Sequence, residues 1–195
     1  DGDLDIISAS GNDDKIIWFE NNGAADPAFS STVIATSADN PNELFIADMD
    51  SDGDLDIIST SEDDSTVAWY ENNGAADPTF TAVDIASDVS GAHGIKVEDM
   101  DSDGDNDIVI ALSTGNTVRW FENNGAANPT FNAADIITGI NGVKDVEVVD
   151  IDKDGDLDIF GTSEAYGDSD GDGISNDLLF YLLNNGQPDP SWNAG

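Results

Sequence analysis

The sequence has no cysteine and very few basic residues. Its 195 residues include 5 Lys and Arg and one His against 42 Asp and Glu, so the formal net charge is -37. Without cysteine the chain forms no disulfide, thiol nucleophile or cysteine-based zinc site. Such an acidic chain repels phosphate backbones and anionic lipid headgroups, which excludes nucleic acid as a partner. No apolar run approaches the roughly 18 residues that span a bilayer, so we expect no membrane insertion.

The apolar content is nevertheless sufficient for a folded core. Hydrophobic residues make up 38% of the chain and aromatic residues 8%, unlike the apolar-poor chains that stay disordered. The question raised by the composition is therefore why a foldable chain carries so many carboxylates.

Two segments recur with a spacing of 51 residues. The first occurs as WFENNGAADPAF at 18–29, WYENNGAADPTF at 69–80 and WFENNGAANPTF at 120–131. The second occurs as DMDSDGDLDII at 48–58, DMDSDGDNDIV at 99–109 and DIDKDGDLDIF at 150–160, and its tail DGDLDII occupies 1–7. A fourth copy of the first segment, YLLNNGQPDPSW at 181–192, comes ten residues late. We therefore predict a single repeat region over 1–195, with repeats 1–51, 52–102, 103–153 and 154–195, the last incomplete and carrying a ten-residue insertion at 167–176.

Each repeat has the pattern of four short strands. In the second repeat they cover 55–60, 66–72, 81–86 and 94–99, which are rich in Ile, Val and aromatic residues and separated by Gly, Asn, Asp and Pro. Four strands in a repeat of about 40–50 residues are typical of a β-propeller blade. We predict an all-β chain of about four propeller blades, each a four-stranded antiparallel sheet, with the recurrent Trp18, Trp69 and Trp120, and also Trp192, packed between blades.

The copies leave the last blade incomplete. The positions missing from the fourth repeat correspond to the third and fourth strands of the last blade and the beginning of a further acidic loop, so a ring closed by these copies alone would lack half a blade. Because the chain also begins at Asp1 and not at Met, we expect part of a larger propeller, completed by further blades of a longer chain or by self-assembly.

The acidic loops have the spacing of a calcium site. From Asp48 to Asp56, carboxylates stand at positions 1, 3, 5 and 9 and a glycine at position 6. Alternate residues of such a loop direct their oxygens inward, the glycine permits the sharp turn, and the carbonyl of position 7 adds a ligand. The side chain at position 7, Asp54, is expected to face solvent. An all-oxygen set favours Ca²⁺ over zinc or copper, and it is larger than magnesium usually takes from protein.

The same assignment extends to the other copies and to the insertion. The candidate ligands are Asp1, Asp3 and Asp5 in the first loop, Asp48, Asp50, Asp52, Asp54 and Asp56 in the second, Asp99, Asp101, Asp103, Asp105 and Asp107 in the third, Asp150, Asp152, Asp154, Asp156 and Asp158 in the fourth, and Asp168, Asp170, Asp172, Ile174, Asn176 and Asp177 in the insertion. The truncated first loop is expected to be weak or empty. The alternative is that the loops are solvated acidic turns.

These loops resemble the calcium-binding FG-GAP and VCBS repeats, the blades of integrin α-subunit propellers and of many bacterial secreted proteins. The DxDxDGxxD loop followed by an apolar strand carries the resemblance across nearly the whole chain. The Phe-Gly and Gly-Ala-Pro segments of the family name are not literally present, and GAADP at 23–27 and 74–78 and GAANP at 125–129 occupy only a similar kind of turn. The resemblance implies a propeller that is usually seven-bladed, structural calcium, and roles in adhesion, carbohydrate binding or support of secreted enzymes.

Signatures of catalysis are few. The sequence contains no HExxH, no G-x-S-x-G and no phosphate-binding glycine loop. The single histidine, His93, corresponds to Asn42 and Lys144 in the flanking copies and is interpreted as a surface-loop residue. The recurrent Glu-Asn-Asn-Gly is interpreted as a hairpin turn, and Phe29, Phe80 and Phe131 as packing residues, with a ligand-binding face as the alternative. We predict no catalytic residues and no cofactor besides Ca²⁺.

The sequence therefore favours an extracellular or cell-surface, calcium-stabilised propeller that binds a protein or glycan ligand. Calcium would neutralise the clustered carboxylates and fix the turn between two strands. We expect the loops to act independently, so that Asp52→Ala and Asp103→Ala each affect only their own loop. Two alternatives stay open, the propeller portion of a secreted polysaccharide lyase or hydrolase and a structural subunit of a surface fibre.

Overall fold

The computed structural model describes residues 2–164, 178–187 and 190–194. Within these ranges the chain is all-β, and no helix long and apolar enough to cross a membrane occurs among them. Several predicted ligands lie outside the described residues, namely Asp1, Asp168, Asp170, Asp172, Ile174, Asn176 and Asp177.

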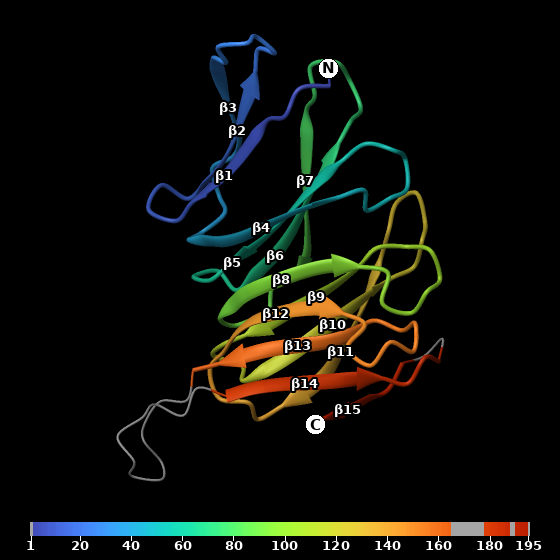
Figure 1. Ribbon diagram of the computed structural model, residues 1–195. Helices are drawn as coiled ribbons and strands as arrows, with labels where there is room; N and C mark the ends of the chain where they lie inside the picture. The colour runs from blue at the N-terminus through green and yellow to red at the C-terminus, as the bar shows by residue number, and fades with distance from the viewer. Residues whose placement is uncertain (1, 165–177, 188–189, 195) are drawn as a thin grey trace.

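The strands form four antiparallel sheets that follow one another along the molecule (Figure 1). The first sheet has three strands, β1 (Ile6–Ser10), β2 (Lys15–Asn21) and β3 (Phe29–Ala35). The other three have four strands each: β4 (Pro41–Ala47), β5 (Asp56–Ser61), β6 (Thr66–Asn72) and β7 (Phe80–Ala86); β8 (Ala92–Glu98), β9 (Asp107–Leu112), β10 (Thr117–Asn123) and β11 (Phe131–Thr138); and β12 (Val143–Val149), β13 (Asp158–Ser163), β14 (Leu178–Asn184) and β15 (Trp192–Ala194). The predicted propeller-like blades are confirmed.

Each four-stranded sheet begins one strand before the acidic loop. The loop after β4 turns the chain back, so that Ala47 pairs with Asp56 and β4 joins the sheet of β5. A sheet therefore takes its first strand from the preceding repeat, whereas the repeat boundaries themselves stay a prediction. The expected loss of the third strand from the last blade is wrong, because β15 pairs with β14. Among the described residues, the sheet with three strands is the first one.

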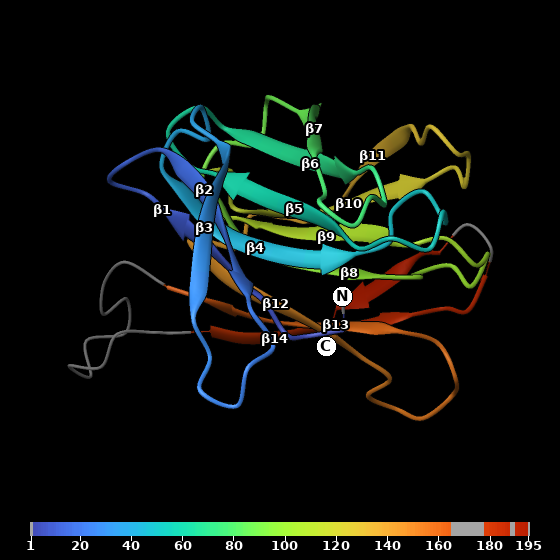
Figure 2. The same ribbon diagram turned by 90° about the horizontal axis from the view of Figure 1, so that it is seen from above.

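The apolar core lies between consecutive sheets. The first strands β4, β8 and β12 lie side by side, and the view from above shows β4 to β6 as a layer across β8 and β9 (Figure 2). All six residues of β5 and all six of β9 are buried, because a neighbouring sheet covers each face. Burial at about 25 cal/mol per Å² of apolar area makes these contacts the main source of stability.

The recurrent aromatic residues pack between sheets with one exception. Trp69 is 1% exposed between the second and third sheets, and Trp120 and Trp192 pack between the third and fourth. Phe80 and Phe131 each pack against the preceding sheet. The prediction is wrong for Phe29, which is 45% exposed because no described sheet precedes its own.

Candidate metal centres

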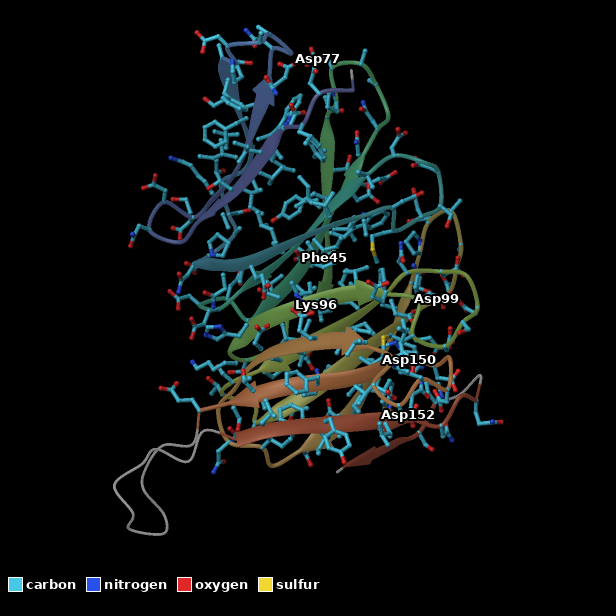
Figure 3. All side chains as sticks on the ribbon, in the orientation of Figure 1. Phe45, Asp77, Lys96, Asp99, Asp150 and Asp152 are labelled. Carbon is cyan, nitrogen blue, oxygen red and sulfur yellow. The ribbon has the colours of Figure 1, made fainter. Side chains whose placement is uncertain are left out.

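The three intact acidic loops lie at the ends of β4, β8 and β12, on one side of the molecule. Figure 3 shows Asp99, Asp150 and Asp152 together on that side. Each loop takes left-handed backbone at position 4, where φ is 60° at Ser51, and again at its glycine, where φ is 97° at Gly53. Only glycine adopts the second conformation without strain, which explains its place at position 6.

The loops bring carboxylate oxygens within reach of one ion. In each loop three residues offer oxygens that all lie within 4.8 Å of one another. The groups are Asp48, Asp50 and Asp56; Asp99, Asp101 and Asp103; and Asp150, Asp152 and Asp158. Each group holds three of the four predicted side-chain ligands, namely positions 1 and 3 in every loop, joined by position 9 in the second and fourth loops and by position 5 in the third.

Backbone N–H groups hold the first carboxylate in place. In the second loop the Oδ1 of Asp48 accepts a hydrogen bond from the Asp52 N–H at 3.2 Å, and its Oδ2 accepts one from the Gly53 N–H at 3.0 Å. The third loop repeats both bonds at Asp99. The chain itself therefore pre-forms the cluster, which lowers the cost of ordering the loop around an ion.

The carboxylate at position 9 ties each loop to the rest of its sheet. Asp56, Asp107 and Asp158 are each 1% exposed. The Oδ2 of Asp107 accepts the Met100 N–H at 3.1 Å, and its Oδ1 accepts the Asn123 N–H at 2.8 Å. Position 9 therefore links the loop to the strand that carries the Asn-Asn-Gly motif.

Burial, and to a smaller extent the neighbouring carboxylates, disfavours the charged form of these acids. Burial raises the pKa of Asp107 to about 7, although the hydrogen bonds from the N–H groups of Asn123 and Met100 act in the opposite direction. Burial, and then the neighbouring carboxylate, raises the pKa of Asp50 and of Asp101. A bound divalent cation would reverse this effect, since it favours the ionised carboxylates.

The donor set fits a calcium ion. The converging groups are all carboxylates of one short loop, and oxygen ligands of this kind are what Ca²⁺ selects in proteins. The side chains at positions 1, 3, 5 and 9 and the carbonyl at position 7 would hold the ion in each intact loop. A bound cation would balance the negative charge of the carboxylates that the fold partly buries.

The side chain at position 7 was predicted to face solvent, and this prediction is wrong. Asp54 is half-buried and lies over Gly74 of the next hairpin, where any β-carbon would collide with its carboxylate. The same arrangement joins Asp105 to Gly125 and Asp156 to Gly186. The glycine of Asn-Asn-Gly is favoured by its left-handed backbone, and a side chain there would also displace this carboxylate.

The Asn-Asn-Gly motif is a hairpin turn, as interpreted from the sequence. The Oδ1 of Asn72 accepts the Gly74 N–H at 3.1 Å, and the Oδ1 of Asn73 accepts the N–H groups of Ala75 and Thr79. These bonds give the two asparagines a structural role in the described residues.

The first loop lacks the enclosure of the others. Asp5, its position 9 residue, is exposed, and its Oδ2 accepts the indole N–H of Trp18 at 2.9 Å. In the intact loops that oxygen accepts the position 2 N–H instead, as from Met49. The indole nitrogens of Trp69 and Trp120 are buried without a hydrogen bond of good geometry.

The histidine is not a loop residue, contrary to the prediction. His93 lies in β8 and is half-buried, with its Nε2 3.5 Å from the Nζ of Lys144. Burial, and then the charge of Lys144, lowers the pKa of His93. The packing of β8 against β12 brings these equivalent positions of consecutive repeats together. The residues around His93 in the sequence do not predict this contact.

Two polar pockets lie beside the loops, between consecutive sheets. One, of about 460 Å³, includes Trp18 and Glu20 of the first sheet and Asp54 and Asn72 of the second. The other, of about 280 Å³, includes Asp101 and Ser102 of the third loop and Asn184 of the fourth sheet. Both are lined by hydrogen-bonding groups of two neighbouring sheets.

Comparison with known proteins agrees with this architecture. Residues 1–59, 48–110 and 99–161 each match the family model of the FG-GAP-like repeat. No curated protein matches the chain. Among solved structures, it is similar to a lectin of Agrocybe aegerita, described for specific recognition of non-reducing terminal N-acetylglucosamine, with a TM-score of 0.58 and 20% identity. The similarity covers 92% of this chain and 48% of the lectin chain, so the chain spans about half the length of that structure.

Proposed function

The chain belongs to the family of FG-GAP-like repeat proteins, and on that basis we propose that it is a calcium-stabilised β-propeller module, extracellular or cell-surface, that binds a glycan or protein ligand without catalysis. The observation that carries the proposal is the convergence of three carboxylates in each intact loop, held by the loop's own N–H groups. Calcium would neutralise these acids and fix the turn from the first strand of a sheet to the second.

Calorimetric titration tests the calcium part of the proposal. We expect at least three ions per chain, one for each intact loop, and an affinity for Ca²⁺ well above that for Mg²⁺ because the loops offer many protein oxygens. Asp48→Asn and Asp99→Asn should each remove one ion. A chain that takes up no Ca²⁺ at millimolar concentration, or that melts at the same temperature with and without chelator, contradicts the proposal.

The ligand part of the proposal rests on the polar pockets between sheets. Trp18 offers an aromatic ring and Glu20, Asp54 and Asn72 offer acceptors or donors, a combination suited to a sugar, which has both apolar faces and hydroxyl groups. The Agrocybe aegerita lectin shares the fold and recognises a terminal sugar. We therefore favour a glycan over a protein ligand.

Binding to immobilised glycans, including ones that end in N-acetylglucosamine, tests this choice. The chain should bind at least one glycan in calcium, and the Glu20→Ala variant should bind it more weakly while it melts like the wild type. Binding that only proteins show would favour a protein ligand instead.

A non-catalytic role agrees with the surroundings of the basic residues. Lys96 pairs with Glu147 at 3.2 Å, Arg119 with Asp135 at 2.6 Å, and His93 is held against Lys144. These groups stabilise the packing of neighbouring strands and are engaged already. Degradation of a polysaccharide by the purified chain that His93→Ala abolishes would favour the lyase or hydrolase alternative.

A specific observation also favours assembly with a further strand. Within the described part of the chain, one edge of β1 has no partner, and the apolar Leu4, Ile6 and Leu55 are 88%, 51% and 60% exposed beside it. Such an edge is a template for pairing with another strand. The mass in solution distinguishes a self-associating chain from a monomer.

A further inference from the structure

The side chain of Asn123 joins two consecutive acidic loops. Asn123 is the first asparagine of the third Asn-Asn-Gly motif and is 1% exposed. Its Nδ2 donates to the carbonyl of Met49 at 2.9 Å, in the loop of the preceding sheet, and to the carbonyl of Asn106 at 3.0 Å, in its own loop. Its backbone N–H donates to Asp107 of its own loop at 2.8 Å.

Asn184 makes the same connection one sheet later. Its Nδ2 donates to the carbonyl of Met100 at 3.2 Å, in the preceding loop, and to that of Leu157 at 3.2 Å, in its own loop. Asn72 holds the equivalent place in the second sheet, where its Nδ2 donates to Leu55 of its own loop at 3.0 Å. Asn72 therefore provides a natural control that has the local bond of the motif.

The bond reaches a residue whose backbone the acidic loop itself also holds. The N–H of Met49 donates to Asp56, the position 9 acid of its loop, at 3.1 Å, and the carbonyl of Met49 accepts from Asn123. The Met49 side chain is 1% exposed in the core between the two sheets. A second bond across the same interface runs from Nδ2 of Asn106 to the carbonyl of Asp48 at 2.8 Å. The carbonyls of positions 1 and 2 of the second loop thus accept hydrogen bonds from the third sheet, one from Asn106 in its loop and one from Asn123 in β10.

We propose that Asn123 and Asn184 are positioning residues that each hold two calcium loops, their own and that of the preceding sheet, so that consecutive loops are coupled. When the second loop is ordered, the Met49 carbonyl holds the side chain of Asn123. The backbone N–H of Asn123 in turn holds the carboxylate of Asp107 in the third loop. Since coupling between two sites is reciprocal, each loop stabilises its neighbour in both directions. The inference rests on the proposed function for the role of calcium, but the hydrogen bonds that carry it exist without the ion.

This coupling replaces the expectation that the loops act independently. A change in one loop is transmitted to the next through a buried side chain, and the loss of one buried hydrogen bond accelerates opening about fivefold or more. Asp52→Ala should therefore accelerate amide exchange not only at residues 48–56 but also at 99–107. In an Asn123→Ala background the second effect should be reduced, and it should disappear when Asn106→Leu also removes the bond to Asp48.

Amide hydrogen exchange of residues 48–56, 99–107 and 150–158 tests the proposal. Asn→Asp is the informative change, because it keeps the acceptor for the glycine N–H and removes the donor. We expect Asn123→Asp to accelerate exchange in 48–56 and 99–107, Asn184→Asp in 99–107 and 150–158, and Asn72→Asp in 48–56 but not in 99–107. If Asn123→Asp does not fold, Asn123→Ala removes the donor without adding a charge.

An effect of Asn123→Asp confined to residues 99–107 would overturn the inference, because the bond to the preceding loop would then carry nothing. The same comparison in calcium and in chelator separates the two proposals. A chain that binds no calcium but keeps the two-loop pattern contradicts the proposed function alone.

Discussion

The first and third sheets carry nearly the same sequence in different surroundings. DGDLDII leads into β1 of the first sheet and DGDNDIV into β9 of the third, and both are followed by Trp-Phe-Glu-Asn-Asn-Gly, which begins in the next strand. Asp107 is 1% and Ile108 0% exposed, whereas Asp5 is exposed and Ile6 is 51% exposed. In the third sheet β8 pairs with β9 and sheets lie on both faces, but in the described residues β1 has only β2.

The comparison separates local from tertiary contributions. The bond from the Asn-Asn-Gly backbone to the position 9 acid is 2.8 Å long in both sheets, from Asn21 to Asp5 and from Asn123 to Asp107. The burial that raises the pKa of Asp107 occurs only where neighbouring strands exclude water. Nearly identical motifs can therefore form the same turn and still differ in how strongly burial disfavours the charged form of the position 9 acid.

Calcium removal should give the largest difference in stability between the first and third sheets. An ion present at a hundredfold excess over its Kd stabilises the folded state by about 2.7 kcal/mol per site, so three loops give a large effect. We expect chelation to lower the melting temperature and to accelerate amide exchange in β5, β9 and β13 far more than in β1. Equal acceleration in all four strands would break the comparison.

Truncation of the position 9 acid should give the next largest difference. Asp107→Ala leaves two buried N–H groups without an acceptor, each of which costs about 1–3 kcal/mol. Asp5→Ala leaves the exposed N–H of Asn21 and the part-buried indole N–H of Trp18, so its cost should be smaller. Urea unfolding of both variants measures the two costs in chelator, where the ion does not contribute. Equal losses would show that burial is not the cause of the difference.

The turn glycines should instead behave alike in the two sheets. Gly23 and Gly125 have φ of 64° and 62°, and a β-carbon on either would collide with the position 7 acid, Asp3 or Asp105. Gly23→Ala and Gly125→Ala should each cost about 1–2 kcal/mol because the strain is local. Thermal melts of the two variants check this, and a loss at Gly125 alone would mean that this feature too depends on the neighbouring sheet.

The smallest expected effect concerns His93 on β8, a strand whose counterpart the first sheet lacks. Its surroundings are Lys144, Glu62, Asp145 and Glu164, and burial holds its pKa below the ordinary value. The unfolded chain takes up a proton near pH 6.5 before the folded one does, so this residue costs stability as the pH falls below about 6.5.

His93→Asn, with the residue found at position 42, removes this cost. The stability of the variant relative to the wild type should be greater at pH 5.5 than at pH 7.5. The change between the two pH values should be less than about 1 kcal/mol because His93 is partly exposed. The loop acids titrate in both proteins, so the difference between two urea unfolding curves at each pH isolates His93. A difference that does not change with pH would contradict the shifted pKa.

Features set by adjacent residues were predictable from the sequence. The loop from Asp48 to Asp56, its glycine turn and the strand from 66 to 72 all depend on spacing and backbone preference, and the structure shows each of them. The solvent-facing Asp54, the packed Phe29 and the loop position of His93 were wrong. Each of these depends on a partner that is distant in sequence: Gly74 for Asp54, a preceding sheet for Phe29, and Lys144 for His93.

The sequence by itself determined the repeat, the all-β class and the oxygen-rich loops, because these follow from periodicity and from the chemistry of residues within one loop. Only the tertiary structure decided which strands share a sheet, which position 9 acids are buried, and that Asn123 reaches from one loop to the carbonyl of Met49 in another. The physical reason is that burial and inter-sheet hydrogen bonds depend on neighbours that are distant in sequence, 74 residues in the case of Asn123 and Met49, and a repeated motif does not specify which neighbours it will have.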